Sequence, residues 1–75
     1  MDKLEKIIAN IFELDPTEIK KEMTPKDIET WDSLSQLDLL STIEKEFKIK
    51  LEFSEIFTVM KIDDIYKLLS KKGVL

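Results

Sequence analysis

Apolar residues recur along the first half of the chain at the spacing of one helix face. The first stripe predicts a helix over residues 3–13, with Asp2 and Glu5 in the pattern of a capping box at its start. Its apolar positions are Leu4, Ile7, Ile8, Ile11 and Phe12. A second stripe predicts a helix over residues 33–47. One broad side of that helix holds Gln36, Leu37, Leu39, Leu40, Ile43 and Phe47.

Two shorter helices are predicted after residue 53. One covers residues 55–59 with Ser54 as its N-cap, and the other covers residues 62–72 with acids in its first turn and Gly73 as its stop. The segment between residues 48 and 53 alternates apolar and charged positions. Because no second run could pair with it as a strand, we expect an extended linker that places three side chains in the core. These are Ile49, Leu51 and Phe53.

Two prolines interrupt the chain between the first two predicted helices. Asp15-Pro16 ends the first helix, because a residue before proline is pushed out of the α region, and Thr24-Pro25 makes a second break. The resulting loop runs to Asp32 and is expected to hold a short helical turn at residues 26–28. Its length predicts a geometric role, since it lets the second helix start where Ser33 is exposed.

The start of the second helix combines a capping residue, a hydroxyl and an apolar side chain. Asp32 can cap this helix, and Ser33 lies in the first turn, where unpaired backbone N–H groups and the helix dipole favour an attached anion. A phosphate ester on Ser33 would fit there. Leu34 projects away from the apolar stripe. Beside Ser33 we interpret it as a docking anchor, although single exposed leucines are common. The side that it shares also carries Asp38, Ser41, Thr42 and Lys45.

Composition argues against catalysis by this chain alone. The 75 residues include no His and no Cys, so no thiolate metal site or disulfide can form and Ser33 lacks the usual general base. We expect one small domain without a metal site. No apolar run approaches the roughly 20 residues that span a bilayer, and the start lacks the layout of a signal peptide, so we expect a cytoplasmic protein.

Charge is unevenly spread along the chain. The net charge is −4, with 12 acids against 6 lysines in residues 1–47 and 4 acids against 6 lysines in residues 48–75. Such a balance disfavours nucleic acid and anionic lipid as ligands. We expect a monomer whose acidic part, which contains Ser33, meets basic patches on partner proteins.

The order Asp32-Ser33-Leu34, then Asp38, then Ile43-Glu44-Lys45-Glu46-Phe47 resembles the second helix of acyl carrier proteins. The likeness covers nearly the whole chain, with one amphipathic helix and a long loop before the motif and two shorter helical segments after it. It implies an all-α fold, an acyl-carrier-like four-helix bundle. Three of its helices are longer, the third is short, and a long loop separates the first two. Residues 1–75 would form a single acyl carrier domain.

The resemblance also implies a prosthetic group and a set of site residues. Ser33 matches the serine that receives 4′-phosphopantetheine covalently from coenzyme A through a phosphopantetheinyl transferase; the thiol of that arm carries acyl groups as thioesters. Asp32, Leu34, Asp38 and Glu44 match positions that meet acyl-loading and acyl-transferring enzymes. The residues implied to line an acyl pocket between the second and third helices are Leu40, Ile43, Phe47, Ile56 and Val59. The implied protein is a carrier rather than an enzyme.

The pathway and two other classes of function stay open at this point. Trp31 stands where fatty acid carriers have a small residue, and the second helix carries few acids. These features favour a dedicated pathway or an aminoacyl or peptidyl carrier. Trp31 itself is interpreted as a partly buried anchor that fixes the approach of the loop to the second helix, with contact to the arm or to a partner as the alternative. A helical interaction module without a prosthetic group is a second class. A serine hydrolase is a third, but it lacks a base and a pocket.

Overall fold

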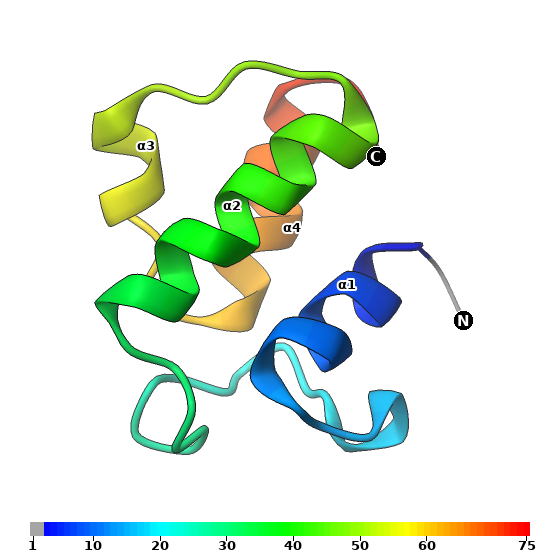
Figure 1. Cartoon of the computed structure of the whole chain (residues 1–75). Helices are drawn as coiled ribbons and strands as arrows, with labels where there is room; N and C mark the ends of the chain where they lie inside the picture. Colours follow the sequence, from blue (N-terminus) through cyan, green and yellow to red (C-terminus); the bar gives the residue numbers. More distant parts are fainter. Residues whose placement is uncertain (1–2) are drawn as a thin grey trace.

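The computed structural model describes residues 3–75, and every regular element in that range is helical (Figure 1). The elements are α1 (Lys3–Phe12), the 3-10 turn η1 (Pro16–Glu18), α2 (Ser33–Phe47), α3 (Phe53–Phe57) and α4 (Ile62–Lys71). The predicted all-α fold with a short third helix and a long loop before the second is confirmed. The capping box predicted at Asp2 lies outside the described residues.

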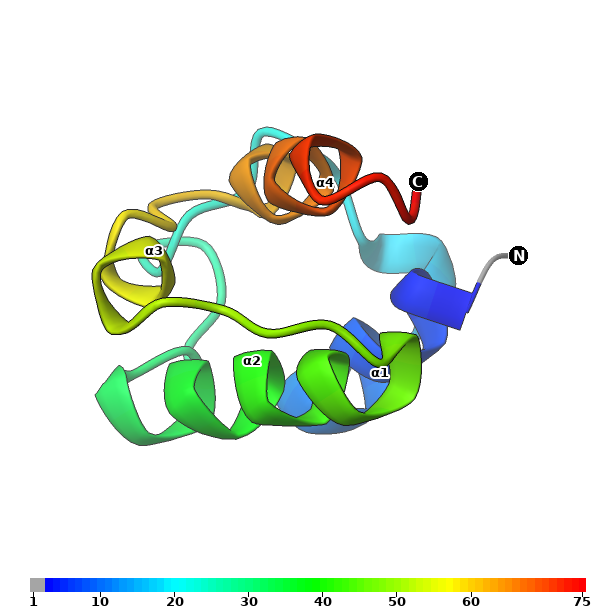
Figure 2. The ribbon, with the colours of Figure 1, turned by 90° about the horizontal axis from the view of Figure 1, so that it is seen from above.

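The helices enclose a core between two layers. Figure 2 shows α1 and α2 on one side of the molecule and α4 on the opposite side, with α3 at one end. The apolar stripes predicted for α1 and α2 face this interior, and so do the buried side chains of α4. The side chains with essentially no exposed surface are Leu4, Ile8, Phe12, Ile28, Leu39, Leu40, Ile43, Ile62, Ile65 and Leu69. No helix within residues 3–75 is long and apolar enough to cross a bilayer.

The loop between α1 and α2 is held in place by contacts at its C-terminal end and near its middle. The Trp31 ring stacks on Phe12 with centroids 5.0 Å apart, and the Thr30 hydroxyl donates a hydrogen bond of 2.6 Å to the Phe12 carbonyl. Further back, the Met23 carbonyl accepts from the Ile62 backbone N–H at 2.9 Å. Trp31 is only 4% exposed, which confirms its interpretation as an anchor of the loop. The loop therefore delivers the chain to α2 along a fixed path.

Three details of the prediction around α3 are wrong. This helix covers Phe53–Phe57 rather than residues 55–59, and its N-cap is Glu52 instead of Ser54. The Glu52 backbone N–H donates to the Glu55 carboxylate at 2.8 Å, and this contact starts the helix earlier than expected. Phe53 consequently belongs to the helix and is 69% exposed, so it does not enter the core. The helices α1 and α4 each end one residue earlier than predicted, as is common where the last turn of a helix frays.

Candidate functional site at the start of α2

Two side chains of the first turn cap α2 reciprocally. The Asp32 carboxylate accepts from the Ser35 backbone N–H at 2.9 Å, and the Ser35 hydroxyl oxygen accepts from the Asp32 backbone N–H at 2.8 Å. Asp32 has an extended backbone conformation, with φ −127° and ψ −173°, as an N-cap requires. The cap thus fixes Ser33 as the first residue of the helix without using the Ser33 side chain.

Ser33 presents its hydroxyl to solvent at the positive end of a 15-residue helix. Among residues 3–75 the Ser33 hydroxyl has no hydrogen-bond partner, and its neighbour Leu34 is 78% exposed, as predicted. An enzyme can therefore reach this oxygen without unfolding any element. Unpaired N–H groups at a helix start favour an attached phosphate. The residues present fit a phosphodiester-linked group at this position.

The cap also sets the charge state of Asp32. The hydrogen bond from the Ser35 backbone N–H lowers the pKa of Asp32 below its ordinary value, and desolvation opposes this only in part. The pKa values of Asp15 and Glu55 are lowered in the same way, chiefly by hydrogen bonds from the backbone N–H groups of Thr17 and Glu52. All three carboxylates are therefore ionised at neutral pH, and Asp32 adds a negative charge directly beside Ser33.

Stability is expected to fall as the pH is lowered from about 5, because the unfolded chain takes up protons before these carboxylates do. A group with a depressed folded pKa adds stability that is complete above its unfolded pKa and is lost as the pH falls through its folded pKa. Asp32→Asn keeps a capping acceptor but cannot titrate, so its melting temperature should fall less steeply between pH 5 and pH 2. Identical slopes for variant and wild type would contradict a role of Asp32 in this linkage.

A glutamine one turn further on joins three parts of the chain. The Gln36 side-chain carbonyl accepts from the Trp31 indole N–H at 3.0 Å, and its amide nitrogen donates to the carbonyls of Ile56 at 2.6 Å and Val59 at 3.3 Å. Gln36 thereby ties the end of the long loop and the end of α3 to the first turns of α2. Sequence reasoning placed Gln36 on the core side but missed this role. The available signal was a polar residue within an apolar stripe.

Ser33 borders a depression of about 220 Å³. The depression is shared between the loop, α2 and α3, so it could not be located from the sequence. Its lining residues are Pro25, Trp31, Asp32, Ser33, Gln36 and Phe57. The candidate attachment site therefore lies next to a small hollow with aromatic and polar walls.

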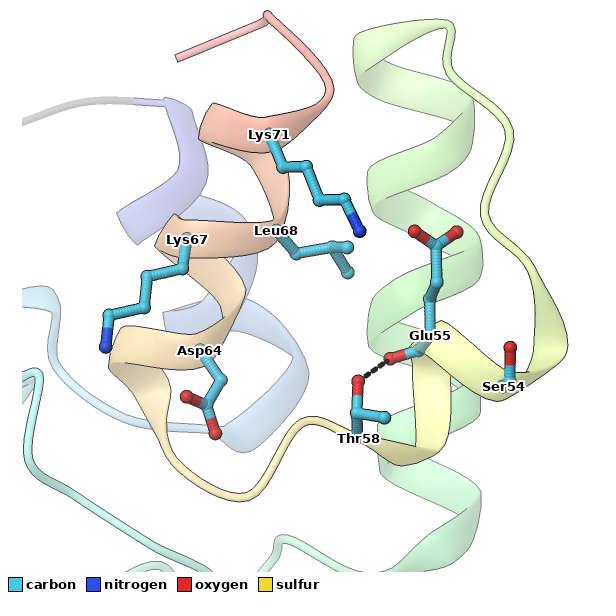
Figure 3. Close-up of a pocket in the computed structure, with 7 residues that line it drawn as sticks. All are labelled: Ser54, Glu55, Thr58, Asp64, Lys67, Leu68 and Lys71. Carbon is cyan, nitrogen blue, oxygen red and sulfur yellow. Dashed lines mark hydrogen bonds between the residues drawn. The ribbon is translucent and has the colours of Figure 1, made fainter.

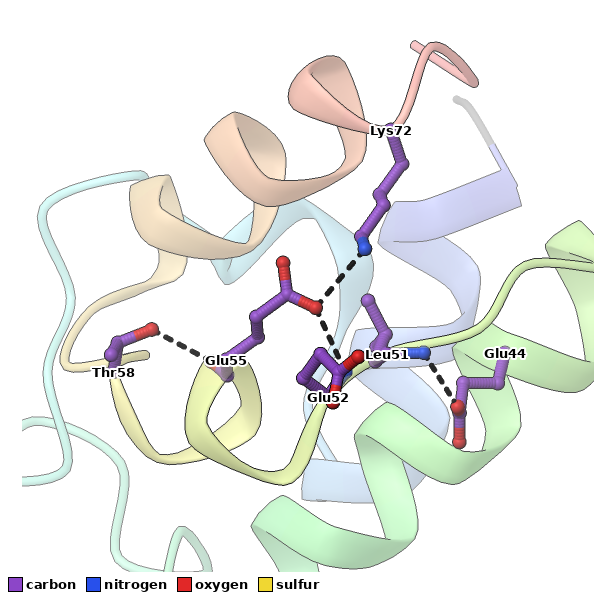
Figure 4. Close-up of polar contacts among 6 residues, drawn as sticks. All are labelled: Glu44, Leu51, Glu52, Glu55, Thr58 and Lys72. Carbon is purple, nitrogen blue, oxygen red and sulfur yellow. Dashed lines mark hydrogen bonds and ion pairs between the residues drawn. The ribbon is translucent and has the colours of Figure 1, made fainter.

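The four residues matched to docking positions differ in their exposure to solvent. Asp32, Leu34 and Asp38 are exposed on α2 and are accessible to a partner. Glu44 is half-buried, and its carboxylate accepts from the Leu51 backbone N–H at 2.8 Å (Figure 4). Glu44 thus fixes the linker between α2 and α3, a structural role that the sequence did not indicate.

The five residues matched to an acyl pocket come together in the core. Leu40, Ile43, Ile56 and Val59 are buried in one cluster, and Phe47 packs against its edge. An acyl chain in this place would have to separate α2 from α3.

A different cleft, of about 420 Å³, lies between α3 and α4 and has no lining residue from α2. Figure 3 shows Glu55 and Lys71 extending into it from opposite helices. The charges in and around this cleft are largely balanced within the chain. Figure 4 shows the ion pair between Glu55 and Lys72. The charged atoms of this pair lie 3.0 Å apart, and those of Lys67 and Asp63 lie 3.3 Å apart. Its lining shares no residue with the depression beside Ser33, so this cleft is not part of the site at Ser33.

Ser33 is exposed at the capped start of α2, where a modifying enzyme can reach its hydroxyl. The model of the family described as phosphopantetheine attachment site matches residues 2–69. The chain therefore belongs to this family of phosphopantetheine-dependent acyl carriers. Its cofactor is covalent 4′-phosphopantetheine, and the chain is a non-catalytic carrier. This finding rules out the alternatives of a hydrolase and of a module without a prosthetic group.

Two relatives place the chain among acyl carrier proteins. It is 25% identical over 71 residues to polyketide-8 synthase acyl carrier protein 2 of Streptomyces avermitilis, and the match covers 95% of this chain and 82% of that protein. The solution structure of holo acyl carrier protein from Geobacter metallireducens superposes with a TM-score of 0.80 at 32% identity. That superposition covers 92% of this chain and 79% of the other. Carriers of this family work with partner enzymes and are modified by a phosphopantetheinyl transferase.

Proposed function

We propose that this chain carries acyl intermediates as thioesters on a phosphopantetheine arm attached to Ser33. The observation that carries the proposal is the Ser33 hydroxyl, which is exposed at the capped start of α2 and has no hydrogen-bond partner among residues 3–75. When bound, the arm supplies a terminal thiol on which acyl groups are held. The chain's own task is to present this arm to successive enzymes, which suits weak and rapid association.

The attachment step needs a base from the transferase. The Ser33 oxygen forms a bond to the phosphorus of coenzyme A that bears the pantetheine, the phosphoanhydride bond breaks, and adenosine 3′,5′-bisphosphate leaves. The hydroxyl proton goes to a base of the enzyme, since this chain has no His or Cys to accept it. Asp32, ionised and exposed beside Ser33, is proposed to help bind the metal and substrate of the transferase.

The proposal is tested by the intact mass of the purified chain after incubation with coenzyme A and a phosphopantetheinyl transferase. We expect a gain of one phosphopantetheine, located by proteolysis on the fragment that contains Ser33. No gain, or a gain on another fragment, would refute attachment at this residue. Wild-type chain is sufficient for this experiment, and circular dichroism before and after incubation serves as the control for folding.

The pathway is proposed to be a dedicated one, in fatty acid, polyketide or related synthesis. Two observations support this: Trp31 in place of a small residue, and similarity to a polyketide synthase carrier. An aminoacyl or peptidyl carrier is the alternative. Offering the loaded chain to fatty acyl, polyketide and aminoacyl loading enzymes tests both ideas. Efficient loading by general fatty acid enzymes would count against a dedicated pathway.

Docking is proposed to use Leu34 together with the acids Asp32, Asp38 and Glu44. Glu44→Gln removes a charge but keeps an oxygen that can accept from the Leu51 N–H, so the fold should persist. We expect this variant and Asp38→Asn to be modified several-fold more slowly by the transferase at low salt, and the difference should shrink as salt screens the charges. Initial rates across a salt series measure the effect. Rates equal to wild type at low salt would exclude these two acids from docking.

The remaining expectations from the sequence become proposals of the same kind. The acyl chain is proposed to enter the cluster of Leu40, Ile43, Phe47, Ile56 and Val59 when α3 moves away from α2, because these side chains are packed together. The chain is proposed to act as one carrier domain over residues 1–75, monomeric and cytoplasmic. Hydrogen exchange in α3 with and without an attached acyl chain would test the first point, and unchanged exchange would contradict it.

A further inference from the structure

The depression beside Ser33 is lined in part by an aromatic side chain, Phe57, which has no role in the attachment step. Ser33, at the start of α2, and Phe57, at the end of α3, border the same hollow of about 220 Å³. Phe57 is 49% exposed, and its ring meets the Phe53 ring edge-on with centroids 5.0 Å apart. An aromatic side chain is thus held half-open to solvent next to the serine.

We propose that this depression seats the first part of the phosphopantetheine arm, with Phe57 against the arm's gem-dimethyl carbon. The inference rests on the proposed attachment at Ser33. In a pantetheine phosphodiester a single methylene group separates the phosphate from this quaternary carbon, which is the first apolar group of the arm. So short a tether keeps the two methyl groups at a hollow that Ser33 itself borders.

The volume of the hollow is suited to one part of the phosphopantetheine arm. Sites for whole small molecules have volumes of about 300–1,000 Å³, so about 220 Å³ suits a fragment of the arm and not its full length. The gem-dimethyl group would cover part of the exposed Phe57 ring. The amides and the thiol, further along the arm, extend beyond the hollow and stay available to partner enzymes.

Gln36 is the positioning residue of this seat. Its amide nitrogen donates to the carbonyls of Ile56 and Val59, which lie on either side of Phe57 in the sequence. The Trp31 indole N–H donates to the carbonyl oxygen of the same side-chain amide, and this bond fixes the orientation of the amide. These bonds together set the place of Phe57 relative to Ser33.

The test is nuclear magnetic resonance on the isotope-labelled chain that carries an unlabelled arm. We expect nuclear Overhauser contacts between the arm's methyl protons and the ring protons of Phe57. The indole N–H of Trp31, the only tryptophan, should also shift when the arm is attached. Phe57→Ala should lose the methyl contacts. Met60→Ala removes another exposed apolar side chain, one that borders a different hollow, and should keep them.

Gln36→Leu tests the positioning role, since leucine has a similar size but forms none of the three hydrogen bonds. In the variant that has received its arm, we expect unchanged amide resonances in α1 and α4 and loss of the contacts between the arm and Phe57. Retention of these contacts would overturn the role of Gln36.

If the wild-type chain gains its phosphopantetheine at Ser33 but the methyl protons of the arm show no contact with Phe57, the seat is refuted while the proposed function stands. If Ser33 is never modified, both fail.

Discussion

Replacing Ser33 with alanine is expected to abolish transfer of phosphopantetheine to this chain. Intact mass should change from complete conversion in wild type to no conversion in the variant, because the variant lacks the only atom proposed to receive the phosphate. The fold should persist, since the Ser33 side chain is exposed and the hydrogen bonds that cap α2 use Asp32 and Ser35. Circular dichroism and the melting temperature of Ser33→Ala should match those of wild type.

Ser35→Ala is the matched control, because it also removes a serine hydroxyl, from a residue two positions further along the same helical turn. The Ser35 hydroxyl oxygen accepts from the Asp32 backbone N–H at 2.8 Å, so this variant should lose about 1 kcal/mol of stability and still be modified completely. The two variants thus separate the attachment oxygen from the capping oxygen. Modification of Ser33→Ala, or a folded Ser35→Ala that stays unmodified, would contradict the assignment.

The parts of the site that the sequence predicted are those governed by neighbouring residues. The bounds of α2, its cap at Asp32 and the exposure of Leu34 all follow from signals within one or two helical turns, and all are confirmed. A capping carboxylate and an apolar stripe with period 3.6 act locally. For this reason the position of Ser33 at the start of a helix was predictable from about fifteen residues.

The parts that the sequence missed depend on contacts between distant residues. The Gln36 side chain donates to the carbonyls of Ile56 and Val59, which lie about twenty residues further along the chain. The residues around Gln36 in the sequence do not indicate these partners. Glu44 was matched to a docking position, but its bond to Leu51 shows that it also holds the linker. Phe53 was misplaced for a related reason, because an alternating pattern cannot show where the extended linker ends and a helix begins.

Phe12→Ala is expected to be among the most destabilising single substitutions in this chain. Phe12 has no exposed surface and stacks on Trp31 with centroids 5.0 Å apart, so the variant leaves a cavity where the long loop meets α1. Such a deletion costs about 3–5 kcal/mol. The whole stability expected for 75 residues is only about 4–11 kcal/mol. Urea unfolding followed by Trp31 fluorescence should show a large drop in the midpoint.

Phe53→Ala is the control for this substitution, because the same ring is removed from a position that is 69% exposed. We expect a loss below about 1 kcal/mol, mainly from the edge contact with Phe57. Equal losses for the two variants would contradict the burial assigned to Phe12. Under conditions where Phe12→Ala is still folded, modification of Ser33 should proceed, because the exposure of its hydroxyl depends on the cap within α2 and not on the stack beneath the loop.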